Sequence, residues 1–319
     1  MLYNLIKIPA RLALLLYCRQ IRFRNKAALQ STGPLLIASN HPNSFLDAVI
    51  LATLFRQPVY SLARGDAFKN KTAARLLKAL HILPVYRATE GVENLEHNYK
   101  TFDACKEIFR KNGIVLIFSE GRCINEWHLR PLRKGTARLA ISAWQDGIPL
   151  KVLPTGINYS SFFCFGKNVQ LNFGTLISTE TSDWTNVHGK SILDFNQQLR
   201  SQLEQLVVEI PGNNRAAVEA VFRVPQPLHK KILLALPAAL GWLLHAPLYI
   251  PVRQFARHGI REEGHFDSVM TGVLLLSYPF YLLLAAFLVF LFTGGWWWLL
   301  VFIVLPFLAW SYVQLKHQF

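Results

Sequence analysis

A histidine and an aspartate lie six positions apart in the stretch NHPNSFLD (residues 40–47), between two apolar segments. An imidazole is the usual group for proton transfer near neutral pH, and a carboxylate bonded to its second nitrogen fixes the tautomer. Because only residues three or four apart share one face of a helix, His41 must precede the helix that carries Asp47. Pro42 also disfavours helical backbone at His41. The pair can therefore act as a general base and the residue that orients it.

The same stretch allows a purely architectural explanation. Ser44 and Asp47 fit the S-x-x-D pattern of a helix start, which makes Ser44 the predicted N-cap residue and Asp47 a cap for the backbone. The local sequence leaves capping and catalysis open, and the two roles can coexist in one turn.

Short apolar runs bounded by proline, glycine or charged residues predict buried strands. They lie at residues 35–39, 58–62, 114–118 and 151–158. Helical patterns lie near residues 44–55, 66–80, 92–111, 134–146 and 191–208. Strands that alternate with helices predict an α/β fold, with a mostly parallel core sheet flanked by helices.

Polar and basic residues follow several of these runs, at the positions where open α/β sheets build ligand sites. They are Arg87, the turn Glu120-Gly121-Arg122, and the cations Arg130, Arg133, Lys134 and Arg138. Arginine suits the bidentate recognition of phosphate. Any one of these cations is more simply a solvated surface charge, but several at successive strand ends favour an anion-binding site.

In this order the motifs resemble those of the glycerolipid acyltransferase family, which includes lysophosphatidic acid and glycerol-3-phosphate acyltransferases, over roughly residues 30–210. NHPNSFLD matches the form of the first motif with five residues between His and Asp. LPVYR (83–87) matches the second motif, with His81 at the usual glycine, and VLPTG (152–156) corresponds to the fourth. The third motif, F-P-E-G-T-R-S, matches IFSEGRC (117–123) only in part, because Ser119, Arg122 and Cys123 replace Pro, Thr and Arg.

The resemblance implies a transfer reaction that needs no protein nucleophile. His41 would be the general base on a glycerol hydroxyl, and Asp47 would orient it. The phosphate of the acceptor would lie near Arg87, Glu120-Gly121 and Arg122, with Lys134 or Arg64 assisting. Because Glu120 carries the wrong charge for phosphate, it is expected to position a hydroxyl or an arginine.

The expected reaction is acylation of glycerol-3-phosphate or lysophosphatidic acid in phospholipid synthesis. Acyl-CoA, acyl-carrier protein or an acyl phosphate would be the donor substrate, and no metal or organic cofactor is expected. The five-residue spacing favours acceptors of the glycerol-3-phosphate type slightly, and a non-phosphorylated lyso-lipid stays open. Two alternatives are a lipid ester or thioester hydrolase that uses the same pair and a non-catalytic lipid-binding protein. The esterase signature G-x-S-x-G is absent, which disfavours the hydrolase.

Charge and composition indicate a membrane partner. The formal net charge is +15, 52% of the residues are hydrophobic, and all but four of the 34 Lys and Arg precede residue 232. An anionic lipid surface or substrate fits this division better than nucleic acid, since no zinc-finger or RNA-binding signature is present. The four cysteines form no C-x-x-C pair and predict free thiols.

Three regions are expected along the chain. Residues 1–30 predict an amphipathic helix at the membrane interface, interrupted by Pro9, with a core-packing helix as the alternative. Residues 31–227 form the predicted catalytic domain, and 228–319 form a hydrophobic helical membrane region.

Within the membrane region, residues 232–251 predict a spanning or re-entrant element, because they carry three prolines and a glycine. Residues 269–292 and 296–313 predict a hairpin of two spans. The arginines at 253, 257 and 261 favour the cytoplasmic side, where the catalytic domain is also expected. Three full crossings are the alternative topology.

Overall fold

The computed structural model describes residues 2–86, 93–180, 188–212, 214–258 and 265–317. Its centre is a seven-stranded sheet in the order β1-β7-β6-β2-β5-β3-β4. The strands are β1 (Cys18–Arg24), β2 (Leu35–Ser39), β3 (Val59–Arg64), β4 (Ile82–Val85), β5 (Ile114–Phe118), β6 (Lys151–Tyr159) and β7 (Lys167–Phe173). This is the α/β fold that the alternating pattern predicts.

The direction of the strands decides which residues share an edge of the sheet. β2 pairs in parallel with both β5 and β6, and Ser39 lies opposite Phe118 and Thr155. β6 and β7 are antiparallel, and β1 is parallel to β7. The first residues of β1 and β7 therefore lie at the same edge as the last residues of β2, β5 and β6.

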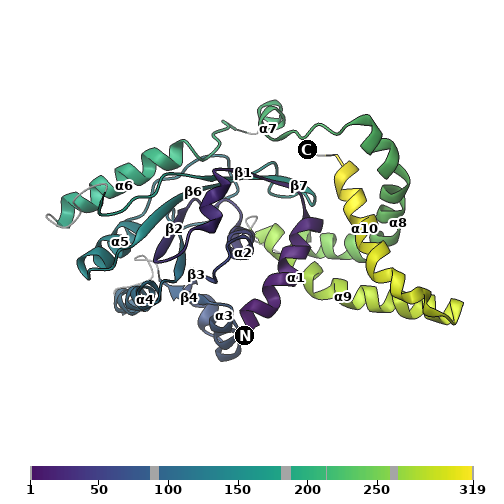
Figure 1. Cartoon of the computed structure of the whole chain (residues 1–319), viewed down its shortest axis with the longest axis horizontal. Coiled ribbons are helices and arrows are strands. Elements are labelled where there is room, and N and C mark those ends of the chain that lie inside the picture. Colours follow the sequence, from purple (N-terminus) through teal and green to yellow (C-terminus); the bar gives the residue numbers. More distant parts are fainter. Residues whose placement is uncertain (1, 87–92, 181–187, 213, 259–264, 318–319) are drawn as a thin grey trace.

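Helices cover both faces of the sheet (Figure 1). One face of β2, β5 and β6 packs against α4 (Glu93–Arg110), α5 (Gly135–Gln145) and α6 (His188–Glu204). The opposite face packs against α1 (Leu2–Tyr17), α2 (Ser44–Leu54), the end of α8 (Leu228–His258) and the start of α9 (Phe266–Thr293). The remaining short elements are η1 (Lys26–Gln30), η2 (Gly65–Phe68), α3 (Lys71–Ala79) and α7 (Arg215–Phe222).

The N-terminal segment differs from the single amphipathic helix expected over residues 1–30. The helix α1 is continuous through Pro9 and ends at Tyr17, and residues 18–24 form the edge strand β1. One face of α1 is buried through Tyr3, Ala10, Leu14 and Tyr17, as the core-packing alternative predicted. The opposite face exposes a stripe of large apolar residues: Leu5, Ile8, Leu12 and Leu15. Burial of one face thus leaves a second apolar face available to lipid.

Among the described residues, three helical segments are long and apolar enough to cross a membrane. They are α8 (Leu228–His258), α9 (Phe266–Thr293) and the run of η5 (Trp296–Leu300) into α10 (Val301–Leu315). The break that prolines suggested near 232–251 does not occur, because α8 is one continuous helix with Pro237, Pro247 and Pro251 inside it. At Gly241 a Cβ would lie 2.1 Å from the carbonyl oxygen of Leu308, so glycine lets α8 and α10 approach closely.

Candidate active site

The turn from β2 into α2 brings His41 and Asp47 into contact. The His41 Nδ1 atom lies 2.8 Å from the Asp47 Oδ2 atom. Asp47 is in the first turn of α2, and its Oδ2 also accepts the backbone N–H of Asn43 at 2.8 Å. The carboxylate therefore reaches back over the helix start to the imidazole, and the six-residue spacing is spanned as the sequence required.

The predicted cap residue is wrong by one position. Asn43 occupies the N-cap, and Ser44 begins the helix with a left-handed backbone, φ 48°. The Ser44 hydroxyl does not cap α2 and lies 2.9 Å from His265 Nδ1 instead. Because Asp47 accepts the Asn43 N–H, it is a backbone cap and a histidine partner at once, so the two explanations of this stretch coexist.

Asp47 is fully buried, and three donors surround its carboxylate. Besides His41 and the Asn43 N–H, the Tyr159 hydroxyl donates to Oδ1 at 2.6 Å. Burial, followed by the charge of Asp47, raises the pKa of Tyr159 well above its usual value, so the phenol stays a donor. Since the ionised carboxylate only accepts, the network assigns the proton to His41 Nδ1. The His41 Nε2 atom is then the nitrogen that can take a proton.

The imidazole is held from the side of β5. Its ring stacks on Phe118, with centroids 3.7 Å apart and planes 7° apart. The His41 backbone N–H donates to Glu120 Oε2 at 2.8 Å, and its carbonyl accepts the N–H of Ile124 at 3.2 Å. The side chain is 18% exposed, so a substrate hydroxyl can approach it.

Glu120 joins two backbone segments. Its second oxygen accepts the N–H of Arg130 at 2.9 Å, and burial raises the pKa of this carboxyl while the two backbone N–H donors oppose the rise. The sequence suggested that Glu120 positions a hydroxyl or an arginine. In the structure it bonds the backbone of Arg130 and of His41, and thereby fixes the turn that carries the imidazole.

The other predicted phosphate contacts are dispersed around the site. Gly121 has φ 69°, a conformation that favours glycine, and a Cβ there would meet the Arg133 side chain at 3.0 Å. Arg122 is exposed in the same turn, and Lys134 is exposed at the start of α5. Arg64 ends β3 and pairs with Asp66 at 2.5 Å. Arg87 lies outside the described residues.

Sequence reasoning missed two side chains that touch the catalytic turn. Tyr159 is the last residue of β6, and the parallel pairing of β6 with β2 brings it beside the turn. The only signal for it in the sequence was an aromatic residue at the end of a predicted strand. Cys123 accepts the Ser44 N–H through its sulfur at 2.8 Å. Burial raises the pKa of the Cys123 thiol to about 12, so it is a poor nucleophile at neutral pH.

A buried carboxylate at the start of the apolar helix α9 also supports the turn. Asp267, in the first turn of α9, accepts the Asn43 side-chain amide at 2.6 Å and the Tyr17 hydroxyl, and it pairs with buried Lys167. The Phe45 N–H donates to Ser268 of the same helix at 3.1 Å. The membrane region therefore contacts the catalytic turn directly, which no local pattern indicated.

Comparison with known proteins identifies the domain around this turn. The model of the Acyltransferase family matches residues 20–158, which include His41, Asp47 and Glu120 but not Tyr159 or Asp267. Over these residues the chain is similar to the acyltransferase family. This match supports the O-acyltransferase activity and the family that the motifs suggested.

Two further comparisons add less. The crystal structure of the 1-acyl-sn-glycerophosphate (LPA) acyltransferase PlsC from Thermotoga maritima is similar at 13% sequence identity, with 65% of this chain and 74% of that chain covered and a TM-score of 0.42. No curated protein matched this chain.

The hydroxyl of Tyr159 offers a test of the buried network. In Tyr159→Phe, Asp47 keeps its other two donors but loses the one on Oδ1. A hydrogen bond to a charged group contributes about 1.5–3 kcal/mol, so we expect kcat of the acyltransferase to fall by about tenfold or more with little change in KM. Steady-state kinetics, with the folded fraction checked by thermal unfolding, measure this. An unchanged kcat would mean that the phenol does not help Asp47 orient His41.

Proposed function

We propose that the enzyme transfers a fatty acyl group to a hydroxyl of glycerol-3-phosphate or lysophosphatidic acid during phospholipid synthesis. The observation that carries this proposal is the His41–Asp47 contact, which leaves His41 Nε2 as the available base inside an acyltransferase domain. The exposed cations around the turn support a phosphorylated acceptor.

In the proposed mechanism His41 Nε2 removes the proton of the acceptor hydroxyl while the oxygen attacks the acyl carbonyl carbon. The new C–O ester bond forms, and the bond to the thiolate or phosphate leaving group breaks. Asp47 stabilises the imidazolium, which then returns its proton to the leaving group. Arg122, Lys134, Arg64 and Arg87 are the proposed contacts of the acceptor phosphate.

Substitution of the base tests both reaction and mechanism. We expect His41→Ala to reduce acyl transfer by about 100-fold or more, the usual contribution of a positioned general base. The assay offers acyl-CoA and acyl-carrier-protein donors with phosphorylated and non-phosphorylated acceptors, and identifies products by mass. Cys123→Ser, which keeps an acceptor for the Ser44 N–H, is the matched control and should stay active. Wild-type rates in His41→Ala would refute the mechanism, and acylation of non-phosphorylated acceptors alone would refute the acceptor class.

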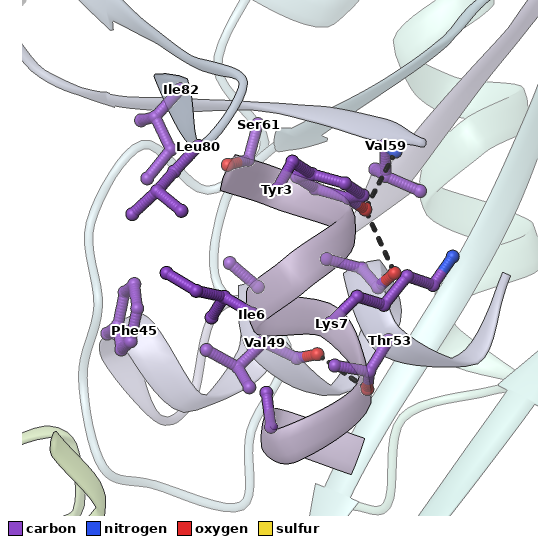
Figure 2. A pocket seen from close by; sticks show the side chains of 13 residues that line it. Tyr3, Ile6, Lys7, Phe45, Val49, Thr53, Val59, Ser61, Leu80 and Ile82 are labelled. Carbon is purple, nitrogen blue, oxygen red and sulfur yellow. Dashed lines mark hydrogen bonds between the residues drawn. The ribbon is translucent and has the colours of Figure 1, made fainter. Parts of the chain in front are cut away.

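An apolar groove beside the catalytic turn supports a lipid substrate. It has a volume of about 90 Å³ and lies between α1, α2 and the strands β3 and β4. Figure 2 shows Ile6 of α1 next to Phe45 and Val49 of α2, with Leu80 and Ile82 beyond them. Phe45 is half-exposed and directly follows Ser44 of the catalytic turn. We infer that part of the acyl chain lies here while its carbonyl is held near His41.

Two substitutions in the groove should act in opposite directions. Ala48→Leu fills the groove, and we expect it to lower kcat/KM for long-chain donors by about tenfold relative to short-chain ones. Val49→Ala enlarges the groove and should shift the preference towards longer chains. Competition between acyl donors of several lengths measures the ratio. Equal effects on every chain length would place the acyl chain elsewhere.

The ends of the apolar helices suggest how the enzyme sits in a membrane. The start of α9 contacts the catalytic turn through Asp267, and the end of α10 contacts Arg19 of β1. The start of α8 bonds the end of α10 through Lys230 and Gln314, while Val252 and Ala256 near its other end belong to the sheet core. We propose that α9 and η5–α10 cross as a hairpin, that α8 enters without a full crossing, and that the domain is cytoplasmic.

Accessibility of single cysteines tests this topology. In a variant without Cys123 and Cys164, Arg257→Cys on exposed α8 should react with an impermeant maleimide on the same side as Lys151→Cys of the domain. Thr293→Cys at the hairpin tip should react on the opposite side. Sealed vesicles of both orientations provide the readout. Labelling of Arg257→Cys together with Thr293→Cys would establish a full crossing by α8.

A further inference from the structure

A second cavity lies where the end of α10 meets the start of α8 and the edge strand β1. Its volume is about 340 Å³, within the usual range of small-molecule sites. The residues that line it are Arg19, Gln20, Val224, Pro225, Gln226, Pro227, Lys230, Trp310 and Gln314. None of these described lining residues is acidic.

Arg19 is the most constrained of these residues. Arg19 is only 6% exposed. Its Nε donates to the Val313 carbonyl at 2.9 Å, and another nitrogen of the guanidinium donates to the Lys316 carbonyl. The Nη1 atom is buried and has no hydrogen-bond partner among the described residues. Burial lowers the pKa of this guanidinium to about 10, so it stays charged at neutral pH. A buried cationic donor without an acceptor is unfavourable, and an anion would relieve it.

Lys230 supplies a second positive charge. Its Nζ donates to the amide oxygen of Gln314 at 2.8 Å and lies over the Trp310 ring, 5.8 Å from the centroid. Gln314 in turn donates to the Arg19 carbonyl at 3.2 Å. The lining thus holds two cations with neutral partners and forms one connected network on three elements.

The position of the cavity indicates the kind of anion. It lies at the first turn of α8 and the last turns of α10, where two apolar helices begin and end beside the domain. Tryptophan favours the headgroup level of a bilayer, and basic pockets between helices at that level bind lipid headgroups. We propose that this cavity binds the phosphate of an anionic membrane phospholipid.

The proposed lipid is distinct from the substrate. In the sheet, β1 is separated from β2 by β7 and β6, and three strand spacings amount to about 14 Å. The bound lipid would therefore anchor the end of the hairpin to the domain while His41 remains open to acceptor and donor.

The chemistry of the lining also selects the headgroup. A choline group needs a free aromatic face or a carboxylate, but Lys230 already lies over the Trp310 ring and the lining has no acid. A headgroup with an uncharged alcohol on its phosphate, as in phosphatidylglycerol, brings no positive charge of its own that would need a partner in the cavity. We expect it to bind more tightly than phosphatidylcholine of the same chains.

Lipid binding to the purified, delipidated full chain in detergent tests the proposal. Native mass spectrometry would count bound dioleoyl phosphatidylglycerol and phosphatidylcholine during titration. We expect Lys230→Gln and Arg19→Gln to weaken one phosphatidylglycerol site by about tenfold, the contribution of a hydrogen bond to a charged group. Lys231→Gln is the matched control, since it removes the same charge from the neighbouring exposed position of α8.

The outcomes are separable. Loss of the site in Lys230→Gln but not in Lys231→Gln supports the proposal, and equal effects of the two would show attraction to charge without a site. Inorganic phosphate at millimolar concentration, added in the absence of lipid, should not raise the unfolding temperature of wild type. A rise that Lys230→Gln abolishes would identify a free phosphate site and overturn the lipid assignment. If Arg19→Gln fails to fold, Lys230→Gln with a wild-type unfolding temperature decides the question.

Discussion

The structure of the site depends on one buried charge, the carboxylate of Asp47. A fully buried carboxylate is unfavourable unless hydrogen-bond donors surround it. Here the three donors are positioned by three different parts of the fold. The Asn43 N–H is available because Asn43 begins a helix, Tyr159 is the last residue of β6, and His41 lies before Pro42 in the turn that leads into α2. Satisfying the carboxylate therefore fixes the relative positions of β2, α2 and β6, and the contact with His41 Nδ1 leaves Nε2 as the nitrogen that can take a proton.

A second buried carboxylate connects this network to the apolar helices. Asn43 donates its backbone N–H to Asp47 and its side-chain amide to Asp267, so one residue lies between the two charges. Lys167 neutralises Asp267 from the start of β7. A buried pair of this kind contributes little net stability but is costly to break, which makes it suited to holding α9 in one place. The catalytic turn and the membrane region are thereby a single packed unit.

The reversed direction of β1 and β7 makes that unit possible. The two strands run opposite to the other five. Arg19 and Lys167, at the starts of β1 and β7, therefore lie at the edge where β2, β5 and β6 end. Both cations then meet the apolar helices, Arg19 at the end of α10 and Lys167 at the start of α9. One edge of the sheet carries the reaction site, the hairpin and the basic cavity.

The sequence by itself determined the alternating α/β pattern, the four strands β2, β3, β5 and β6 to within a few residues, and the pairing of His41 with Asp47. These depend on local periodicity, turn residues and short spacing. The tertiary structure alone decided that residues 18–24 pair with β7, that Glu120 bonds backbone N–H groups, and that Tyr159 and Asp267 complete the site. Asp267 is 224 positions from Asn43, and contacts over such separations depend on how strands are ordered and helices docked. Local spacing carries no information on either.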